Sequence, residues 1–402
     1  MTADVLVLGS NFGGLTAALA IKHELEDDVD VTVVSPSQRF VFTPSLIWVP
    51  FGKRSLEQIS FPVAPTLDEH EIDFVHQGAT AIDPDQKTVT LADGTTRSYD
   101  YLVIATGYRN DLERVPGIGD GANASTITTV SEAFAAGSQW ARFLQDPGDI
   151  VIGATQGAGC FGAAYEFLFN TAYQLKKHKI HKQVKLTYVT AEPFLGHFGI
   201  GGLPHGEQLL GMFTKMAHIE TMTNASMREI DEGVVRLDDG RNLDFSWAMI
   251  VPPFLGQEVV ASTPGLADEK GFVPVRGTYQ SEKYDDIYTV GVAAAVAAPW
   301  TTPVPVGIPK TGFPTEQQAH VAARNIAAQV RGEQPSEEKF FGDIPAVCVM
   351  DAGNNGVVIL ADKMLPPRKR GVLVPGPQAH AMKLAFEKYF LWKSKNGYVN
   401  LP

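Results

Sequence analysis

The chain has 402 residues, more than a single hydrophobic core usually organises, so two or three domains are expected. Hydrophobic residues make up 44% of the chain and charged residues 19%, which excludes a disordered protein. The net charge of −12 opposes phosphate backbones and anionic lipid, and only residues 368–370 form a basic run, so no nucleic-acid partner is expected.

The N-terminal segment reaches an apolar strand at residues 5–8 without the pattern of an export signal, so the chain is expected in the cytoplasm. No window reaches the roughly 18 uninterrupted apolar residues of a membrane span, so any membrane contact has to be peripheral. No metal site is predicted. The two cysteines, Cys160 and Cys348, are too few for a disulfide scaffold, although one specific pair stays open.

The first 35 residues alternate strand, helix and strand, the order of a parallel-sheet α/β protein. The first strand leads into a glycine-rich turn with Gly9, Asn11 and Gly14, followed by a helix over 15–25 and a strand over 31–34. Such a turn lets a pyrophosphate approach the backbone at a helix N-terminus.

Two positions in this unit depart from the dinucleotide-binding pattern. Asn11 replaces the middle glycine, although asparagine is the residue that best tolerates a left-handed backbone after glycine. Ser35 stands where an acidic residue would bind a ribose. The turn alone leaves the nucleotide open, and an ordinary tight strand-to-helix connection is the alternative.

The stretch from 78 to 107 adds two β-rich segments joined at Asp93-Gly94, a hairpin signal, and then an apolar strand that ends in Ala105, Thr106 and Gly107. This stretch resembles the FAD domain of the pyridine-nucleotide-disulfide reductase superfamily, in which the Ala-Thr-Gly turn packs against the cofactor. The resemblance implies that the chain binds FAD.

A second half of the chain repeats this order, with a glycine-rich turn at 153–160, a strand at 185–190 and a hairpin at Asp239-Gly240. In NADH-using members of the superfamily the corresponding unit binds the nicotinamide cofactor. Because Cys160 and bulky Phe161 follow the turn here, NADH is not expected to bind.

The segment at 286–291 resembles the strand that carries the superfamily's second flavin contact, with Gly291-Val292 in place of the usual Gly-Asp pair. Residues 309–312 then open a long helix that runs to about residue 328. Lys310 beside this helix start is suited to stabilising negative charge on a reduced flavin, and a solvated lysine at an ordinary helix start is the alternative.

Several uncommon strings sharpen the resemblance, over nearly the whole chain, to the sulfide:quinone oxidoreductase family. They are residues 157–162 with 165–166, 192–193 with 196–200, 301–305, 309–312, 346–348 and 385–390. The resemblance implies two Rossmann-like dinucleotide-binding domains and a C-terminal segment. It places an FAD-binding domain at 1–112 and 255–335, a second domain at 113–254, and a segment with one cysteine and the quinone or membrane interface at 336–402.

By this resemblance, Cys160 and Cys348 are a redox-active pair that oxidises sulfide to polysulfide or sulfur, with electrons passing through FAD to a quinone. Hydrosulfide would attack a bridge between them, so that Cys160 carries the sulfur chain and Cys348 faces the flavin. A helix start at Cys160 is also expected to lower its thiol pKa. Read singly, each cysteine is more often a small buried hydrophobe.

The same resemblance assigns further residues to the site. His197 and Glu166 join the catalytic set, with a packed histidine as the alternative for His197. The cofactor-binding residues are Gly9, Asn11, Gly14, Ser35, Pro44, Ser45, Ala79, Ala105, Thr106, Gly107, Gly291, Lys310, Thr311 and Gly312. The quinone-binding residues are Phe313, Phe386 and Phe390.

Two positions depart from the family pattern, because Thr128 stands for a third cysteine and Glu132 for a histidine four positions later. The core redox step can survive the loss of the cysteine, whereas the handling and length of the sulfur chain are left open. Covalent attachment of FAD is left open as well.

The C-terminal helix predicted around residue 386 is amphipathic. Its apolar residues are Met382, Phe386, Phe390 and Leu391, flanked by Lys383, Lys388 and Lys393. The pattern suggests quinone or peripheral membrane contact, and packing on its own domain or on a second copy of the chain is the alternative.

Three functions compete at this point. A sulfide:quinone oxidoreductase is supported by both cysteines. A type II NADH:quinone dehydrogenase shares the scaffold but requires a working second nucleotide site. A flavin-binding sulfur sensor or carrier without turnover is the third, and the identity of the quinone and the oligomeric state are left open.

Overall fold

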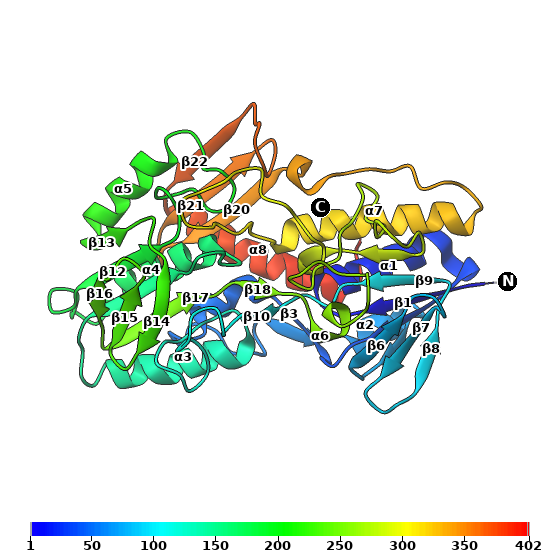
Figure 1. Cartoon of the computed structure of the whole chain (residues 1–402), viewed down its shortest axis with the longest axis horizontal. Helices are drawn as coiled ribbons and strands as arrows, with labels where there is room; N and C mark the ends of the chain where they lie inside the picture. Colours follow the sequence, from blue (N-terminus) through cyan, green and yellow to red (C-terminus); the bar gives the residue numbers. More distant parts are fainter. Residues whose placement is uncertain (1, 400, 402) are drawn as a thin grey trace.

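The computed structural model describes residues 2–399 and 401. Two α/β units lie toward opposite ends of its long axis, and the C-terminal helix α8 (Pro377–Lys395) runs between them (Figure 1). The predicted fold class, with two Rossmann-like units and a C-terminal segment, is confirmed. The domain boundaries stay predictions.

A five-stranded parallel sheet forms the first unit. In spatial order its strands are β19 (Ile287–Thr289), β9 (Tyr101–Ile104), β1 (Ala3–Leu8), β2 (Val29–Val34) and β5 (Asp73–Val75). Val5 and Val7 pack against helices α1 (Phe12–Leu25) and α7 (Gly312–Val330), while Leu6 and Leu8 face the other side, because successive strand residues alternate. A three-stranded antiparallel sheet covers that side, with β6 (Ala79–Asp83), β7 (Thr88–Leu91) and β8 (Thr96–Ser98).

The second unit repeats this layering around a four-stranded parallel sheet. Its spatial order is β13 (Ile219–Met222), β12 (Leu186–Thr190), β11 (Ile150–Ala154) and β17 (Trp247–Val251). Ile150 and Ile152 share a core with α4 (Phe161–Lys177) and α3 (Val130–Phe143), and Val151 faces a three-stranded antiparallel sheet. That sheet consists of β14 (Met227–Asp231), β15 (Val234–Leu237) and β16 (Asn242–Asp244).

Both predicted hairpins are confirmed, because Gly94 between β7 and β8 has φ 83° and Gly240 between β15 and β16 has φ 88°. Glycine adopts such left-handed backbone without strain. Helix α1 begins at Phe12, earlier than predicted, since Gly13 and Gly14 continue it.

The C-terminal sheet is antiparallel, with strands β20 (Ala346–Asp351), β21 (Gly356–Ala361) and β22 (Gly371–Pro375). Ala346 and Met350 pack into the core shared with α4, and Cys348 lies between them on the same face of the sheet. Val349 on the opposite face packs against Ala379 of α8. Cys348 is thereby directed toward the second unit.

Short elements complete the fold, and two pairs of them form small antiparallel sheets, β3 with β4 and β10 with β18. They are η1 (Glu26–Asp28), β3 (Arg39–Val41), η2 (Thr43–Trp48), β4 (Ser60–Pro62), α2 (Ala64–Glu69), β10 (Arg109–Asn110), α5 (Gly206–Met216), β18 (Phe254–Leu255), α6 (Glu258–Ala261), η3 (Gly291–Ala293) and η4 (Phe341–Asp343). None of the helices in residues 2–399 is long and apolar enough to cross a membrane.

Candidate active site

The first glycine-rich turn brings β1 and β9 into close contact. A Cβ atom on Gly9, which has φ 110°, would lie 2.3 Å from the Ala105 carbonyl oxygen, and one on Gly14 would lie 1.8 Å from the Gly9 carbonyl oxygen. Both positions therefore require glycine. Asn11 needs no left-handed backbone, because its φ is −97° and its side-chain oxygen accepts from the Val41 N–H at 3.3 Å. The reason predicted for asparagine there is wrong.

The other predicted FAD segments converge on this turn. A Cβ atom on Gly13 would lie 3.2 Å from side-chain carbons of Thr315 in α7 and of Val290 after β19. Gly312, the first residue of α7, packs against α1 at a similar distance. The N-termini of α1 and α7 therefore meet next to Gly291, although these segments are about 300 residues apart in the sequence.

Several features of this junction fit FAD. Neither Asn11 nor Thr311 caps the following helix with its side chain, which leaves the helix N-termini suited to an anionic group. Thr106 Oγ1 is buried and has no hydrogen-bond partner within the described part of the chain. Open space lies in front of Gly107, which has φ 72°. A buried hydroxyl of this kind beside open space is satisfied by a bound polar group.

Two predicted cofactor residues have hydroxyl groups that already bond to the protein. Ser35 Oγ accepts from Ser10 Oγ at 2.9 Å and from the Ser37 N–H at 3.1 Å. Ser45 Oγ donates its only proton to Glu387 of α8 at 2.5 Å, so its hydroxyl can only accept from a further group. Pro44 lies beside Ser45 in η2, and Ala79 starts β6.

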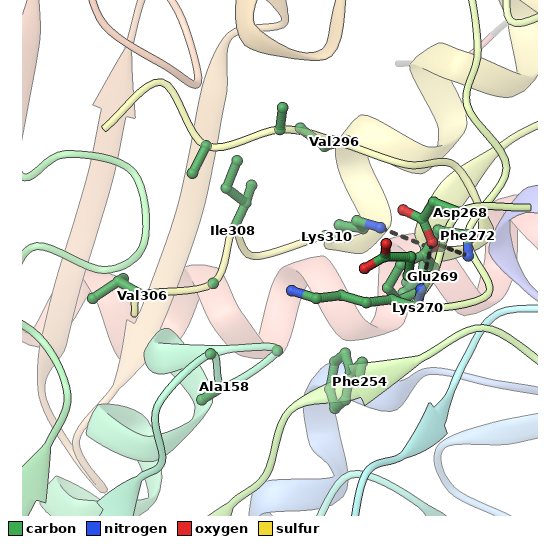
Figure 2. A pocket seen from close by; sticks show the side chains of 16 residues that line it. Ala158, Phe254, Asp268, Glu269, Lys270, Phe272, Val296, Val306, Ile308 and Lys310 are labelled. Atoms are coloured by element: carbon green, nitrogen blue, oxygen red, sulfur yellow. Dashed lines mark hydrogen bonds between the residues drawn. The ribbon is translucent and has the colours of Figure 1, made fainter. Parts of the chain in front are cut away.

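Lys310 is not the solvated lysine of an ordinary helix start, so that alternative is wrong. Its ammonium donates to the Val292 and Ala294 carbonyl oxygens at 2.9 and 2.6 Å and lies 3.7 Å from the centre of the Phe272 ring (Figure 2). Burial lowers the pKa of Lys310 to about 7. Lys310 fastens the start of α7 to the segment after Gly291, and its effect on flavin charge stays a prediction.

The two cysteines come from different parts of the fold. Cys160 immediately precedes α4, and Cys348 lies in the middle of β20. Both are free thiols, Cys160 half-buried and Cys348 exposed. Cys160 is among the groups that raise the pKa of Cys348, and Glu166 and Lys383 act on both thiols. Helix α4 and strand β20 pack against each other, so the two cysteines lie on neighbouring elements.

The helix start does not make Cys160 acidic. Burial raises the pKa of its thiol and outweighs the N–H groups of Ala163 and Gly162, which lower it. Although the Cys348 side chain is accessible from solvent, the protein atoms around it reduce its hydration and raise the pKa of its thiol, and the Glu166 carboxylate adds to this. The predicted lowering at Cys160 is wrong, because loss of hydration exceeds the effect of the helix N-terminus.

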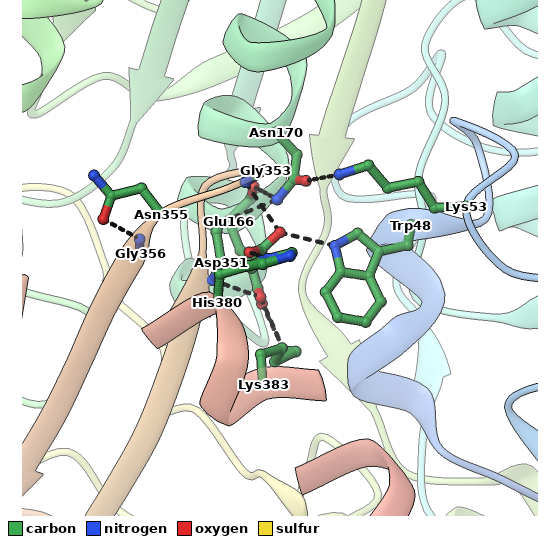
Figure 3. Close-up of polar contacts among 10 residues, drawn as sticks. All are labelled: Trp48, Lys53, Glu166, Asn170, Asp351, Gly353, Asn355, Gly356, His380 and Lys383. Atoms are coloured by element: carbon green, nitrogen blue, oxygen red, sulfur yellow. Dashed lines mark hydrogen bonds and ion pairs between the residues drawn. The ribbon is translucent and has the colours of Figure 1, made fainter. Parts of the chain in front are cut away.

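Glu166 and Lys383, which act on both thiols, form a buried ion pair (Figure 3). Glu166, six residues after Cys160 in α4, bonds to Lys383 Nζ at 2.8 Å, and it also accepts from the Asp351 N–H at 2.8 Å. Asp351 ends the strand that carries Cys348. One carboxylate thus joins the helix that follows Cys160, the strand that carries Cys348, and α8.

Asp351 ties this site to the first unit. Its carboxylate accepts from Trp48 Nε1 at 2.8 Å and from the Gly353 N–H at 3.1 Å, and it lies 2.5 Å from His380 Nδ1. Burial opposes ionisation of Asp351, yet these bonds outweigh it and hold the pKa of the carboxyl below its usual range. Asn170 of α4 donates to the Asp351 carbonyl oxygen at 3.0 Å.

His197 is buried in the loop that follows β12. Its ring centre lies 4.9 Å from that of Trp300 and 5.3 Å from that of Phe194, both edge-on. Its Nδ1 has no hydrogen-bond partner among residues 2–399 and 401. Glu192, which is also buried, holds the loop by accepting from the Phe198 N–H at 2.7 Å. This packing favours the alternative of a structural histidine, and the catalytic assignment stays a prediction.

His197 and Glu192 are expected to give the stability of the protein opposite dependences on pH. Burial lowers the pKa of His197 from 6.5 to about 4, so its contribution to stability is lost as the pH falls from 6.5 toward 4. Burial raises the pKa of Glu192 from 4.5 to about 7, so its contribution is lost as the pH rises from 4.5 toward 7.

Melting temperatures between pH 4 and 8 test this expectation. The variant His197→Phe keeps a ring but cannot titrate, so it is expected to lose less stability than the parent on acidification. Glu192→Gln is expected to lose less stability than the parent when the pH is raised from 4.5 toward 7. Parallel pH profiles for the parent and both variants would contradict both assignments.

The backbone of the second glycine-rich turn is held by contacts with other parts of the chain. The Gly157 N–H donates to the Pro305 carbonyl oxygen at 2.7 Å, and a Cβ atom on Gly159 would lie 2.1 Å from the Phe254 ring. The backbone group that would meet a pyrophosphate is therefore already bonded to the chain's own loop.

The ribose position of the second unit is closed as well. Glu192, two residues after β12, stands where an acidic residue would bind a ribose. Its carboxylate is directed inward instead, to the Phe198 N–H at 2.7 Å and the Thr190 hydroxyl at 2.9 Å.

Thr128 and Glu132 form a hydrogen-bonded cluster with Asn110. Thr128 Oγ1 donates to Glu132 at 3.0 Å, and Asn110 Nδ2 donates to Glu132 at 2.7 Å. Glu132 also accepts from the Thr129 N–H at 2.9 Å and completes a capping box at the start of α3. The two departures from the family pattern thus stabilise a helix start.

The predicted quinone-binding aromatic residues lie on two helices. Phe390 is buried between Phe12 and Phe42, with ring centres 5.9 and 5.8 Å away, and Phe386 stacks on it at 5.4 Å. Phe313 lies in the first turn of α7.

The inner face of α8 is charged, which the sequence did not indicate. Lys383, Glu387 and Lys393 are all buried and pair with Glu166, Arg54 and Glu316, respectively. The prediction that Lys383 and Lys393 flank an apolar face at the surface is wrong. Met382 and Trp392 are the exposed large apolar residues of α8, and peripheral membrane contact and self-association stay predictions.

The family profile described as pyridine nucleotide-disulphide oxidoreductase matches residues 3–325. A sulfide-quinone reductase of Aquifex aeolicus is 36% identical over 99% of this chain and 93% of that protein. The X-ray structure of the sulfide:quinone oxidoreductase from that bacterium superposes with a TM-score of 0.93, over 98% of this chain and 92% of that one.

The chain belongs to the sulfide:quinone oxidoreductase family. A type II NADH:quinone oxidoreductase of Staphylococcus aureus is more distant, at 25% identity over 91% of each chain. Sulfide:quinone oxidoreductases are FAD-dependent, so this member is an FAD-dependent enzyme, and the predicted recognition and cofactor are confirmed.

Four residues at the site of this sulfide:quinone oxidoreductase family member had no sequence signal. They are Trp48, Asp351, His380 and Lys383, which the fold brings to Glu166 and the cysteines from separate elements. Asp351, Trp48 and Lys383 are each three positions from a predicted residue, namely Cys348, Ser45 and Phe386, but the sequence does not relate them to one another.

Proposed function

We propose that this chain oxidises sulfide to polysulfide or sulfur through Cys160 and Cys348 and passes the electrons through FAD to a quinone. The observation that carries the proposal is that the helix after Cys160 and the strand of Cys348, which bear the chain's two cysteines, are joined through Glu166, which pairs with Lys383 and accepts from the Asp351 N–H. The names of the A. aeolicus relatives support sulfide and quinone as the substrates.

In the proposed reaction a disulfide or a longer sulfur bridge joins the two cysteines. Hydrosulfide attacks the bridge and one S–S bond breaks, which leaves a persulfide on Cys160 and a thiolate on Cys348. The persulfide then bonds to the Cys348 sulfur, loses its proton and gives up two electrons, so the bridge closes one sulfur longer. FAD, when bound, supplies the two-electron acceptor.

The charged residues beside the cysteines have separate roles in this proposal. Lys383 lowers the pKa of both thiols, so its positive charge stabilises the thiolate that hydrosulfide releases. Glu166 positions the helix that follows Cys160 against the strand of Cys348, through Lys383 Nζ and the Asp351 N–H. The turn at Ala105 and the N-termini of α1 and α7 would hold FAD.

Anaerobic addition of sulfide to the purified protein tests the proposal through flavin absorbance. We expect sulfide to bleach the flavin, a short-chain quinone to restore it, and NADH to have little effect. If sulfide does not bleach the flavin, the proposal is wrong. Bleaching that no quinone reverses would instead indicate a sulfur sensor or carrier without turnover.

The NADH arm of this experiment separates the proposal from a type II NADH:quinone dehydrogenase. The bond from the Gly157 N–H to Pro305 and the inward direction of Glu192 favour the absence of an NADH site. Rapid bleaching by NADH would favour the dehydrogenase.

A further inference from the structure

A pocket of about 420 Å³ lies beside the second glycine-rich turn (Figure 2). Gly157, Ala158 and Gly159 line one side and lead directly into Cys160. The other walls are mostly apolar and include Phe254, Phe272, Val296, Val306 and Ile308. Because one water molecule needs only about 15 Å³ of cavity, this pocket has room for a species much larger than a hydrosulfide ion.

One positive charge in this pocket is free to bind a ligand. The Lys270 side chain, which is exposed, extends along the pocket on the side of Ala158 and Val306, and its ammonium makes no hydrogen bond or ion pair within the described part of the chain (Figure 2). Lys310 lines the same pocket but donates to two backbone carbonyl oxygens.

The two acidic residues of the pocket also differ in whether the protein already binds their charged group. Asp268 accepts from the Lys270 and Phe272 N–H groups, both at 2.9 Å, so its carboxylate is used in the turn. Glu269 carries a negative charge without such backbone partners in the described structure. The pocket therefore combines apolar walls with an unpaired ammonium and one opposing carboxylate.

We propose that this pocket receives sulfur anions on the way to or from Cys160, and that Lys270 is the cation that recognises them. The proposal rests on the proposed function. A polysulfide has a polarisable, apolar chain and a negative end, which match the walls and the ammonium. Since the protein carries a net charge of −12, a local cation is needed to offset its repulsion of anions.

A nicotinamide cofactor does not suit this pocket. The Gly157 N–H is bonded to Pro305, and the Phe254 ring lies against Gly159, so the turn offers no anchor for a pyrophosphate within the described structure. Hydrosulfide that enters and polysulfide that leaves both carry a negatively charged sulfur, which Lys270 would recognise. The experiment therefore tests each of the two anions separately.

The first arm measures the second-order rate constant of flavin reduction by sulfide, at low and at high salt, for three variants of the holoenzyme. Lys270→Gln is expected to lower this constant by about threefold to tenfold, with a weaker salt dependence. Glu269→Gln is expected to raise it. The control Lys182→Gln removes an exposed lysine of the second unit that does not line the pocket and is expected to behave like the parent.

The second arm uses inorganic tetrasulfide, whose binding is measured calorimetrically and as inhibition of sulfide oxidation. Lys270→Gln is expected to weaken its binding by a similar factor. If Lys270→Gln matches Lys182→Gln in both arms, the proposal is overturned. If sulfide fails to reduce the flavin of the parent, the proposed function fails, and tetrasulfide binding alone then decides whether Lys270 recognises a sulfur anion.

Discussion

Replacing Cys348 with serine is expected to abolish flavin reduction by sulfide, with a loss of about 100-fold or more in the rate constant. A serine hydroxyl forms no bridge to Cys160 and is a far weaker nucleophile than a thiolate. Cys348 is exposed on its face of β20, so the substitution is expected to change the free energy of unfolding by less than about 0.5 kcal/mol. Stopped-flow absorbance of the flavin after mixing with sulfide measures the loss.

The control for this variant reduces the flavin with a reagent that does not react through the cysteines. Dithionite reduces a flavin without a thiol, so Cys348→Ser reduced in this way is expected to return electrons to a quinone at the rate of the parent. Cys160→Ser is expected to fail with sulfide in the same manner. If Cys348→Ser were bleached by sulfide as fast as the parent, hydrosulfide would reach the flavin directly and the cysteines would have another role.

The parts of the fold that the sequence predicted are those that depend on local patterns. Alternating strands and helices identified both α/β units, and glycine at 94 and 240 located the two hairpins, because turn chemistry is set by adjacent residues. Gly9 and Gly14 were found for the same reason, since the turn around them requires glycine whatever lies elsewhere.

The errors concern residues whose state depends on distant partners. Lys383 and Lys393 resemble solvated lysines beside an apolar helical face, but Glu166 and Glu316 reach them from helices far away in the sequence. Cys160 shows a related failure. Its place at a helix start is local and was predicted, whereas the burial that raises its thiol pKa comes from the packing of the whole site.

The cysteine pair was predicted, although it depends on distant contacts and not on a local pattern. No local pattern relates Cys160 to Cys348, and only the family resemblance indicated that they meet. The structure shows that the elements that carry them are joined, because the Glu166 carboxylate bonds both to Lys383 and to the backbone of the strand that carries Cys348. The proposed pairing therefore depends on a residue that was assigned to catalysis and that the contacts favour as a positioning residue.

Removing either member of the Glu166–Lys383 ion pair is expected to destabilise the protein by about 3–5 kcal/mol, because it leaves an uncompensated buried charge. The double variant Glu166→Gln/Lys383→Met is expected to be more stable than either single variant, since both charges are then absent. Urea unfolding followed by circular dichroism measures these differences. Additive losses in the double variant would show that the two side chains do not interact.

The same variants separate a positioning role from an electrostatic one at the thiols. Glu166 raises and Lys383 lowers the pKa of both cysteines. The pH profile of flavin reduction by sulfide is therefore expected to shift to lower pH in Glu166→Gln and to higher pH in Lys383→Met. Simple disorder at the site would reduce the rate without moving the two profiles in opposite directions. Opposite shifts would show that both charges act on the thiolate, and equal rate losses without shifts would leave Glu166 and Lys383 with a structural role alone.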